Sequence, residues 1–556
     1  MKQKQYGFIL FLWIFLLFLP GAGDAALFEQ LAIETRSASL GNAVTADPQG
    51  PMAAVHYNPA ALDRVRGIEA TAGLFYIPVL NVKGKFTQAI DPATGDYWAP
   101  FGGWFNNGRD PEDGHESSTS GSAELPFLGA PPIGLAAPNL AIAYHKANSP
   151  FAFGVGVYAP FGAGMVHDDD NDPYRFLGKR MSILRLVTAP TISYRVAKSL
   201  SVGASFGLGM SYMGFDTKMR APNDLVALTG ALGEATVGLE IPILSELTLP
   251  PPWFGGGLNP YEEMGGVKFF AEDNLNTSYN IGFLWEPYEW VSFGGVYQSE
   301  CKADMKGEYT FSYSDRMRRT INWLGSSPTT IIIAAMLDLP TYAPAEVKGN
   351  MSIEVIYPAR AQFGIKLKPH PRIKLLADAH WAQWSAWKAM EIGFDRDNEL
   401  LRLAKLMGYQ GGDRKLIMEN HFSDTWHFSY GLELQPLDFL TIRLGYEDRP
   451  TSVSPNYFGP VPLGDMKLYS AGIGLAMKHP DRNFHGLMGL AHQILQADRI
   501  DLGFTYMTSK VKVGYNQSKL FNSVNFTDVI YNPFAGLEYE SETTAYIIAF
   551  NMTWFF

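Results

Sequence analysis

Arginines on the polar side of strand-like stretches are the residues best suited to bind an anionic ligand. They are Arg185, Arg195, Arg443 and Arg499. A guanidinium group can give a carboxylate two charge-assisted hydrogen bonds, so Arg185, Arg443 and Arg499 are our candidates for holding a ligand carboxylate. The alternative is a structural ion pair, for which Asp501 and Glu447 lie nearby in sequence. Structural pairing is the interpretation we favour for any single arginine.

Two long segments without strand alternation carry apolar residues that could capture an apolar ligand. Leu225, Leu228 and Leu232 follow helical spacing within 217–275, and Ile321 and Trp323 lie within 314–351. Apolar patches at the rim of a protein either pack on each other or bind a ligand. We expect partial packing of one segment on the other, with a remaining groove for an alkyl chain.

The sequence offers little for catalysis or for a resident metal ion. His167, Asp168, Asp169, Asp170 and Asp172 have enough oxygens for Ca²⁺, but the spacing of an EF-hand loop is absent and a solvated loop is favoured. The single cysteine, Cys301, excludes a disulfide framework and a multi-cysteine metal site. No Ser/His pair suited to a lipolytic enzyme stands out. We therefore predict no enzyme activity, no metal and no cofactor.

The N-terminus has the features of a secretory signal peptide. Lys2 and Lys4 precede an apolar run of twelve residues at 8–19, and small residues follow up to Ala25. A membrane-spanning helix needs about twenty apolar residues, so residues 1–25 are predicted to be a cleaved signal. The net charge of −11 argues against nucleic acid as a partner.

The last fourteen residues, 543–556, alternate strictly. Their apolar row comprises Tyr546, Ile548, Phe550, Met552, Trp554 and Phe556. A period of two indicates a strand, and a row this apolar indicates lipid on one face. In lipid only a closed barrel satisfies every backbone group of such strands. Fourteen candidate strands between residues 68 and 556, joined alternately by short turns and long connections, predict an all-β outer-membrane barrel. A soluble β-sandwich would also alternate, but it would not explain the signal peptide or the rhythm of connections.

Two further stretches bear on a passage through the barrel. Residues 26–67 are rich in Gly, Ala, Asn and Pro and form either a periplasmic tail or a plug in the lumen. The third candidate strand contains Gly154, Gly156, Ala159, Pro160 and Gly162. Glycine marks bulges and proline cannot donate to a ladder, so this strand either frays into a loop or breaks the wall.

Seven motifs occur in an order and spacing that resemble the FadL/TodX (OmpP1) family of outer-membrane channels for long-chain fatty acids and other hydrophobic compounds. The first is Asn58-Pro59-Ala60 after SLGNAVTAD, which resembles that family's hatch motif. The others are VGVYAPFGAG with the following YRFLGKRMSILRLVTAPTISYRV, GGVYQSECKADMKGEY, PARAQFGIKL, LLADAHWAQWSAW, IRLGYEDRPTSVSP and IDLGFTYMTSKVKV. The resemblance implies a fourteen-stranded barrel, a hatch in its lumen and a kinked third strand that opens a lateral gap.

These observations predict three parts: a signal peptide at 1–25, a hatch at 26–67 and a transmembrane barrel at 68–556. The predicted function is passive uptake of long-chain fatty acids or similar molecules across the outer membrane, by capture at the loops, passage past the hatch and lateral exit through the wall. The alternatives are uptake of aromatic or alkane hydrocarbons and, from another class, a lipolytic enzyme. We expect a monomer surrounded by outer-membrane lipid, assembled by the barrel-assembly machinery through its C-terminal strand.

Overall fold

The computed structural model describes residues 32–556 except 122–134, 168, 240–248, 406–408, 421, 454–463, 478–496 and 515–531. The predicted signal peptide thus lies outside the described residues. The connection at 479–498 also lies outside them, except for residues 497 and 498. No described helix is long and apolar enough to cross a membrane.

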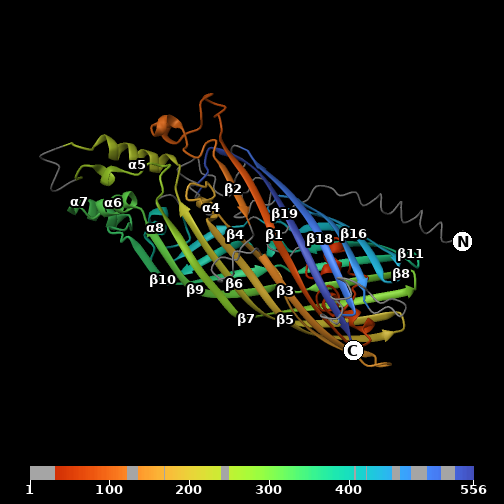
Figure 1. Ribbon diagram of the computed structural model, residues 1–556. Coiled ribbons are helices and arrows are strands. Elements are labelled where there is room, and N and C mark those ends of the chain that lie inside the picture. Colours follow the sequence, from red (N-terminus) through yellow and green to blue (C-terminus); the bar gives the residue numbers. More distant parts are fainter. Residues whose placement is uncertain are drawn as a thin grey trace.

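The described strand segments form one closed antiparallel sheet (Figure 1). The first nine are β1 (Gly67–Gln88), β2 (Glu116–Gly121), β3 (Leu135–His145), β4 (Phe151–Val166), β5 (Arg180–Ala197), β6 (Leu200–Met219), β7 (Gly265–Tyr288), β8 (Val291–Gln298) and β9 (Cys301–Tyr313). The remaining ten are β10 (Glu346–Tyr357), β11 (Arg360–His370), β12 (Ile373–Ala382), β13 (Ala389–Phe394), β14 (Lys415–Glu419), β15 (Thr425–Leu437), β16 (Leu440–Arg449), β17 (Met466–Ala476), β18 (Arg499–Val513) and β19 (Leu537–Phe555). Five pairs of consecutive segments (β2/β3, β8/β9, β10/β11, β12/β13, β14/β15) each continue one strand, so the barrel has fourteen strands, as predicted.

Pairing of the first strand with the last closes the barrel. β1 and β19 run antiparallel from Glu69 opposite Phe555 to Gln88 opposite Leu537. The backbone N–H of Phe556 also donates to the oxygen of Ile68 at 2.9 Å. Along β19 the larger apolar row faces outward, whereas Ile547 and Ala549 of the other row are buried inside. No edge strand is left to expose unpaired backbone groups to lipid.

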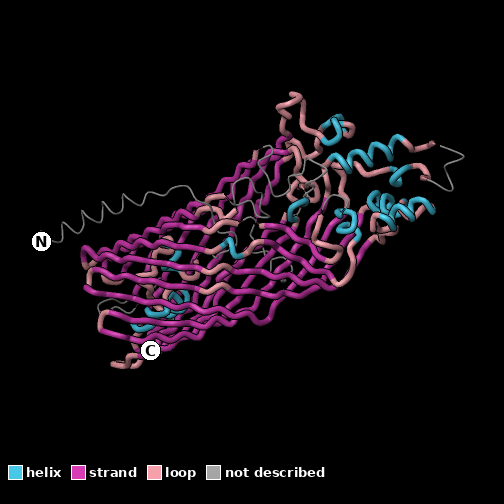
Figure 2. Tube along the Cα trace, turned by 180° about the vertical axis from the view of Figure 1, so that it is seen from behind, coloured by secondary structure: helices cyan, strands magenta, loops and turns pink. Residues whose placement is uncertain are grey.

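The two rims of the barrel differ. At one rim strands are joined by tight turns, and the C-terminus lies there (Figures 1 and 2). The other rim carries the long connections and most helices: α4 (Arg175–Gly178), α5 (Asp224–Ala235), α6 (Asp315–Trp323), α7 (Pro328–Met336), α8 (Glu399–Lys405), η2 (Pro100–Gly103), η3 (Asn106–Gly108), η4 (Trp253–Gly256) and η5 (Trp384–Ala386). In an outer-membrane barrel the rim with long loops faces the outside of the cell.

Residues 32–66 precede β1 and form the hatch, which packs against the inner face of the wall. It consists of α2 (Thr35–Ser39), α3 (Pro51–His56) and η1 (Pro59–Arg64). Nearly all of its residues are buried. Wall glycines let the hatch backbone come close, because a Cβ on Gly203 would overlap Pro59 and one on Gly445 would overlap Gly41. A Cβ on Gly294, Gly431, Gly472 or Gly503 would likewise lie 3.0 Å or less from a hatch atom.

One hatch carboxylate, Asp47, joins the hatch to the wall through ion pairs. Its oxygens lie 2.8 Å from Arg36 and 2.9 Å from Arg64, both in the hatch. They also lie 3.1 Å from Lys374 of β12 and 3.4 Å from Lys366 of β11. The Asp47 side chain is 5% exposed, so solvent screens these pairs only weakly. Four cations on one buried carboxylate therefore connect two hatch elements and two strands.

Asn58, in the predicted hatch motif, forms a second link to the wall. Its Oδ1 accepts from the N–H of Ala60 and caps η1, which begins at Pro59. Its Nδ2 donates to the oxygen of Thr45 at 3.0 Å and to the oxygen of Phe283 on β7 at 2.9 Å. Proline at the first helical position has a φ that suits the helix start. The motif thus makes a rigid turn that is hydrogen-bonded to the barrel.

The lipid-facing row of β19 gives a first prediction. Phe550→Arg should lower the free energy of unfolding by about 2–4 kcal/mol, because a charge near the middle of the apolar band loses its hydration. Denaturant titration in lipid vesicles measures the change. The matched control is Thr544→Arg, on the same face but beside the charged Glu542, where the cost should be about 0–1 kcal/mol. An equal effect at both positions would contradict the assigned orientation.

The ion pairs of Asp47 give a second prediction. Asp47→Asn should loosen the hatch, because removing one partner of buried ion pairs costs about 3–5 kcal/mol. Limited proteolysis of the folded barrel should then cut within 32–66, and ion conductance across a planar bilayer should rise. Asp438→Asn is the control, since Asp438 forms an exposed pair with Arg372. A hatch that stays resistant to protease after Asp47→Asn would show that the ion pairs do not hold it.

Candidate functional site

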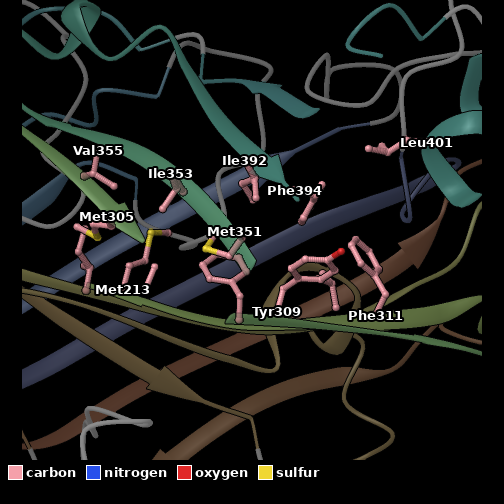
Figure 3. Packing of buried hydrophobic residues seen from close by; sticks show 14 of the residues in the cluster. Met213, Met305, Tyr309, Phe311, Met351, Ile353, Val355, Ile392, Phe394 and Leu401 are labelled. Carbon is pink, nitrogen blue, oxygen red and sulfur yellow. The ribbon is translucent and has the colours of Figure 1, made fainter. Parts of the chain in front are cut away.

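Above the hatch, toward the long loops, the inner face of the barrel is apolar. We call the buried inward-facing side chains of this region the apolar lining: Phe269, Met305, Tyr309, Phe311, Met351, Ile353, Val355, Ile392 and Phe394 (Figure 3). The opposite face of the same strands is polar, and the exposed residues of β9 include Lys302, Asp304, Lys306 and Glu308. In the membrane-embedded part the pattern is reversed, with apolar residues outside. The apolar lining can therefore accommodate an apolar ligand outside the bilayer.

A polar cluster around Arg185 of β5 lies where the apolar lining ends. Arg185 is 4% exposed, and its guanidinium donates to Asn276 Oδ1 at 2.8 Å and Ser278 Oγ at 3.0 Å. The guanidinium also lies 5.4 Å from the ring centre of Tyr357, whose hydroxyl donates to Ser211. Among the described residues Arg185 has no carboxylate within ion-pair distance. A buried cation with only neutral partners has a high cost, which a ligand carboxylate would offset.

The other two candidate arginines lie in ion pairs within the wall. Arg443 of β16 pairs with Glu433 at 2.9 Å and Asp501 at 2.7 Å. Arg499 of β18 pairs with the same Asp501 at 2.9 Å. Glu433 in turn pairs with Arg36 of the hatch. These arginines thus extend the ionic network around Asp47, and Arg195 similarly pairs with Asp63 of η1.

The third strand, β4, is irregular beside the hatch. It pairs with β3 only from Ala152 to Val157 and with β5 along its whole length. Between Tyr158 and Phe161 the register to β5 shifts, so β4 has one extra residue there. The alternation of burial stops at the same place, since Tyr158, Ala159, Pro160 and Phe161 are all buried. Beyond Val157 the described strand neighbours of β4 all lie in β5.

The glycines of β4 lie on either side of this bulge. Gly154 and Gly156 pair regularly with β3 and β5, and Gly162 pairs with Leu184 beyond the bulge. A Cβ on Gly154 would press on Leu62, and one on Gly156 would press on Val55. These two glycines therefore make room for the hatch, and the irregular backbone is at Ala159 and Pro160.

The long loops pack on each other through η4. The rings of Phe254 and Trp323 lie 4.9 Å apart in a tilted contact, and the Trp323 indole donates to the oxygen of Pro250 at 2.7 Å. Ile321 of α6 is fully buried and adjoins the apolar lining. Leu225 and Leu228 are half-buried, and Leu232 is 36% exposed. The rim also exposes an apolar stretch on α7: Ile331, Ile332, Ile333 and Met336.

The acidic loop after β4 forms internal contacts. His167 Nδ1 lies 3.0 Å from Asp172 Oδ2, and Asp170 pairs with Lys179. Burial raises the pKa of Asp172, but hydrogen bonds and the charge of His167, with a hydrogen bond from Ser117, outweigh burial and lower it overall. Asp168 lies outside the described residues, and no metal-holding group of three such side chains occurs among those described. Ser117 approaches Nδ1 of His167, the same nitrogen that contacts Asp172, so the three do not form a proton relay.

Several residues of this region carried no recognisable sequence signal. Asn276, Ser278, Ser211 and Tyr357 surround Arg185 from three strands far apart in the chain. Asp47 is likewise one of many acidic residues until its four partners are seen. Strand alternation indicates which residues face the lumen, but barrel register and tilt decide which of them meet.

The comparisons with known proteins agree with this architecture. Residues 20–556 match the model of the family described as outer membrane protein transport protein (OMPP1/FadL/TodX). A FadL homologue from Pseudomonas aeruginosa has a TM-score of 0.62 at 15% identity, covering 96% of this chain and 99% of that one. The Pseudomonas putida toluene transporter TodX has a TM-score of 0.55 at 15% identity, with 96% and 100% covered. The CymD monoaromatic hydrocarbon channel has a TM-score of 0.52 at 12% identity, with 95% and 100% covered.

No sequence among curated proteins matches. The structural likenesses establish the fold, because their sequence identity is low. The family match covers nearly the whole chain. Together with the closed fourteen-stranded barrel, it shows that this chain belongs to the OMPP1/FadL/TodX family of outer-membrane channels for hydrophobic compounds.

Proposed function

We propose that this channel takes up long-chain fatty acids or similar amphipathic carboxylates by passive diffusion. The observation that carries the proposal is Arg185, a buried cation with neutral partners at the lower end of an apolar lining. An acyl chain would lie in the lining while its carboxylate accepts hydrogen bonds from the guanidinium. An uncharged aromatic hydrocarbon would gain nothing from Arg185, which distinguishes this proposal from hydrocarbon uptake.

The external loops are the proposed capture site. Leu232 and the apolar stretch of α7 are exposed at the rim, and Ile321 connects that rim to the apolar lining. Burying apolar surface gains roughly 25 cal/mol per Å². A ligand would therefore move from partly exposed to fully buried contacts as it descends, without any other energy source.

The proposed exit is lateral, between β3 and β4. The hatch fills the lumen below Arg185 and is held by Asp47 and Asn58. An acyl chain of several hundred Å² that entered the aqueous periplasm would lose several kcal/mol at roughly 25 cal/mol per Å². The bulge at Ala159 and Pro160 is beside the hatch, and strand pairing between β3 and β4 ends just before it. A path through the wall there would deliver the ligand into the bilayer.

A third prediction tests the carboxylate site. Arg185→Gln should weaken binding of a C16 carboxylate by roughly 10- to 100-fold, because a hydrogen bond to a charged group contributes about 1.5–3 kcal/mol. The C16 alcohol, which lacks the charge, should bind equally well to both proteins. Tryptophan fluorescence titration and uptake of both ligands measure this, and Arg185→Lys should restore part of the affinity. Equal loss for acid and alcohol would contradict the assigned role.

A fourth prediction tests the exit. In a Cys301→Ser background, Ala136→Cys and Gly162→Cys place thiols on β3 and β4 beside the bulge. A short bis-methanethiosulfonate crosslinker, which forms a disulfide with each thiol and releases methanesulfinate, should abolish uptake while ligand binding persists, and reduction should restore uptake. The control pair, Leu140→Cys and Val157→Cys, joins residues that are already directly paired, so its crosslink should leave uptake unchanged. Normal uptake through the crosslinked test pair would mean that the ligand leaves elsewhere.

A further inference from the structure

One row of inward-facing residues crosses the wall on the loop side of Arg185. Strand register places Ile183, Met213, Ala271, Gly307, Met351 and Phe394 opposite one another on β5, β6, β7, β9, β10 and β13. Arg185 is two residues from Ile183 on the same strand. In the register of β5 and β6, Arg185 is paired with Ser211 and Ile183 is paired with Met213. Two strand residues span about 7 Å. At β5 and β6 the row therefore lies one inward-facing pair above Arg185, whereas Met351 lies six residues along β10 from Tyr357, the residue of that strand beside Arg185. An acyl chain that descends the apolar lining would pass this row before its head group reaches Arg185.

Two of the four bulky side chains of this row are methionines. Met213 and Met351 occupy it, and Met305 on β9 lies two residues from Gly307, opposite Ile353. Figure 3 shows Met213, Met305 and Met351 in the same part of the apolar cluster. The neighbouring Ala271 and Gly307 contribute almost no side chain. The methionines thus occupy the space over a shallow part of the wall.

These methionines are buried in the present structure. Met305 is 0% exposed, Met351 is 4% exposed and Met213 is 8% exposed, within one continuous apolar cluster. A ligand that descends through this cluster to Arg185 would have to displace them. Methionine is unbranched, with three rotatable bonds and a polarizable sulfur, so it can repack around ligands of different shape at little cost. Isoleucine at these positions would be fixed at χ1 and could not yield in the same way.

We propose that Met213, Met305 and Met351 form an adaptable gate that determines which ligand shapes reach Arg185. This inference rests on the proposed uptake function and adds to it a substrate class: carboxylates whose apolar part is branched or contains fused rings, besides linear acyl chains. A linear chain needs only a narrow opening between side chains. A ring system needs all three methionines to move together. The gate is therefore required most for the bulky ligands.

The experiment replaces the three methionines by residues of similar size but less freedom. The triple variant Met213→Ile, Met305→Ile and Met351→Ile keeps volume and apolarity, and isoleucine suits strands. The control variant is Met466→Ile with Met507→Ile, two equally buried inward-facing methionines on β17 and β18, in a different cluster that contacts Ala32 and Ala38 of the hatch. The probes are hexadecanoate and a pyrene-bearing alkanoate, measured by uptake into proteoliposomes.

The triple variant should transport the pyrene-bearing acid at least about fivefold more slowly, while hexadecanoate changes by less than about twofold. Thermal unfolding of the triple and control variants should match the unmodified protein within a few degrees, so that folding is not the cause. Equal slowing of both probes, or no slowing of either, would overturn the gate.

A separate outcome concerns the proposed function itself. If the unmodified protein transports neither carboxylate, that function is wrong. The transport rates of the triple variant and the unmodified protein are then compared with hexadecane and pyrene as probes. A selective loss of pyrene transport in the triple variant would still support the gate. Equal transport of pyrene by both proteins would overturn the gate.

Discussion

The ion pairs of Asp47 are the interaction on which the rest of this structure depends. One buried carboxylate forms ion pairs with two hatch arginines and two wall lysines, and Glu433 continues the network to Arg443 and Asp501. A buried ion loses its hydration, so each member is stable only while its partners stay in place. The hatch and the wall consequently form one unit within the membrane-embedded part of the lumen.

The contacts between the hatch and the wall, which we call the seal, determine what kind of passage the barrel can offer. Glycines such as Gly445 and Gly203 bring the hatch backbone against the wall and leave no room for an apolar chain at those positions. Above the seal the lumen becomes apolar and the exterior polar, as the exposed charges of β9 show. An apolar ligand thus meets a suitable surface only down to Arg185. The irregular backbone of β4 is at the level where that surface ends.

The three candidate arginines show how neighbours decide the role of identical side chains. All three are inward-facing strand residues, and nothing in their local sequence separates them. Arg443 and Arg499 share Asp501, whereas Arg185 is bounded by amide and hydroxyl groups. Most arginines inside barrels form structural ion pairs in the wall, and structural pairing is the interpretation that the sequence favours for any one of them. Arg185 differs because the three strands beside it contribute neutral side chains at its level.

The sequence by itself determined the barrel, because a period of two with an apolar outer row, as from Tyr546 to Phe556, is stable only as a closed sheet in lipid. It also indicated the hatch motif at Asn58 and an irregular third strand, since proline cannot take part in a ladder. Only the tertiary structure decided that the irregularity is at Ala159 and Pro160, and that Gly154 and Gly156 make room for the hatch. It alone assembled Arg185 with Asn276 and Ser278, because contacts between distant strands follow from barrel register, which alternation along one strand does not encode.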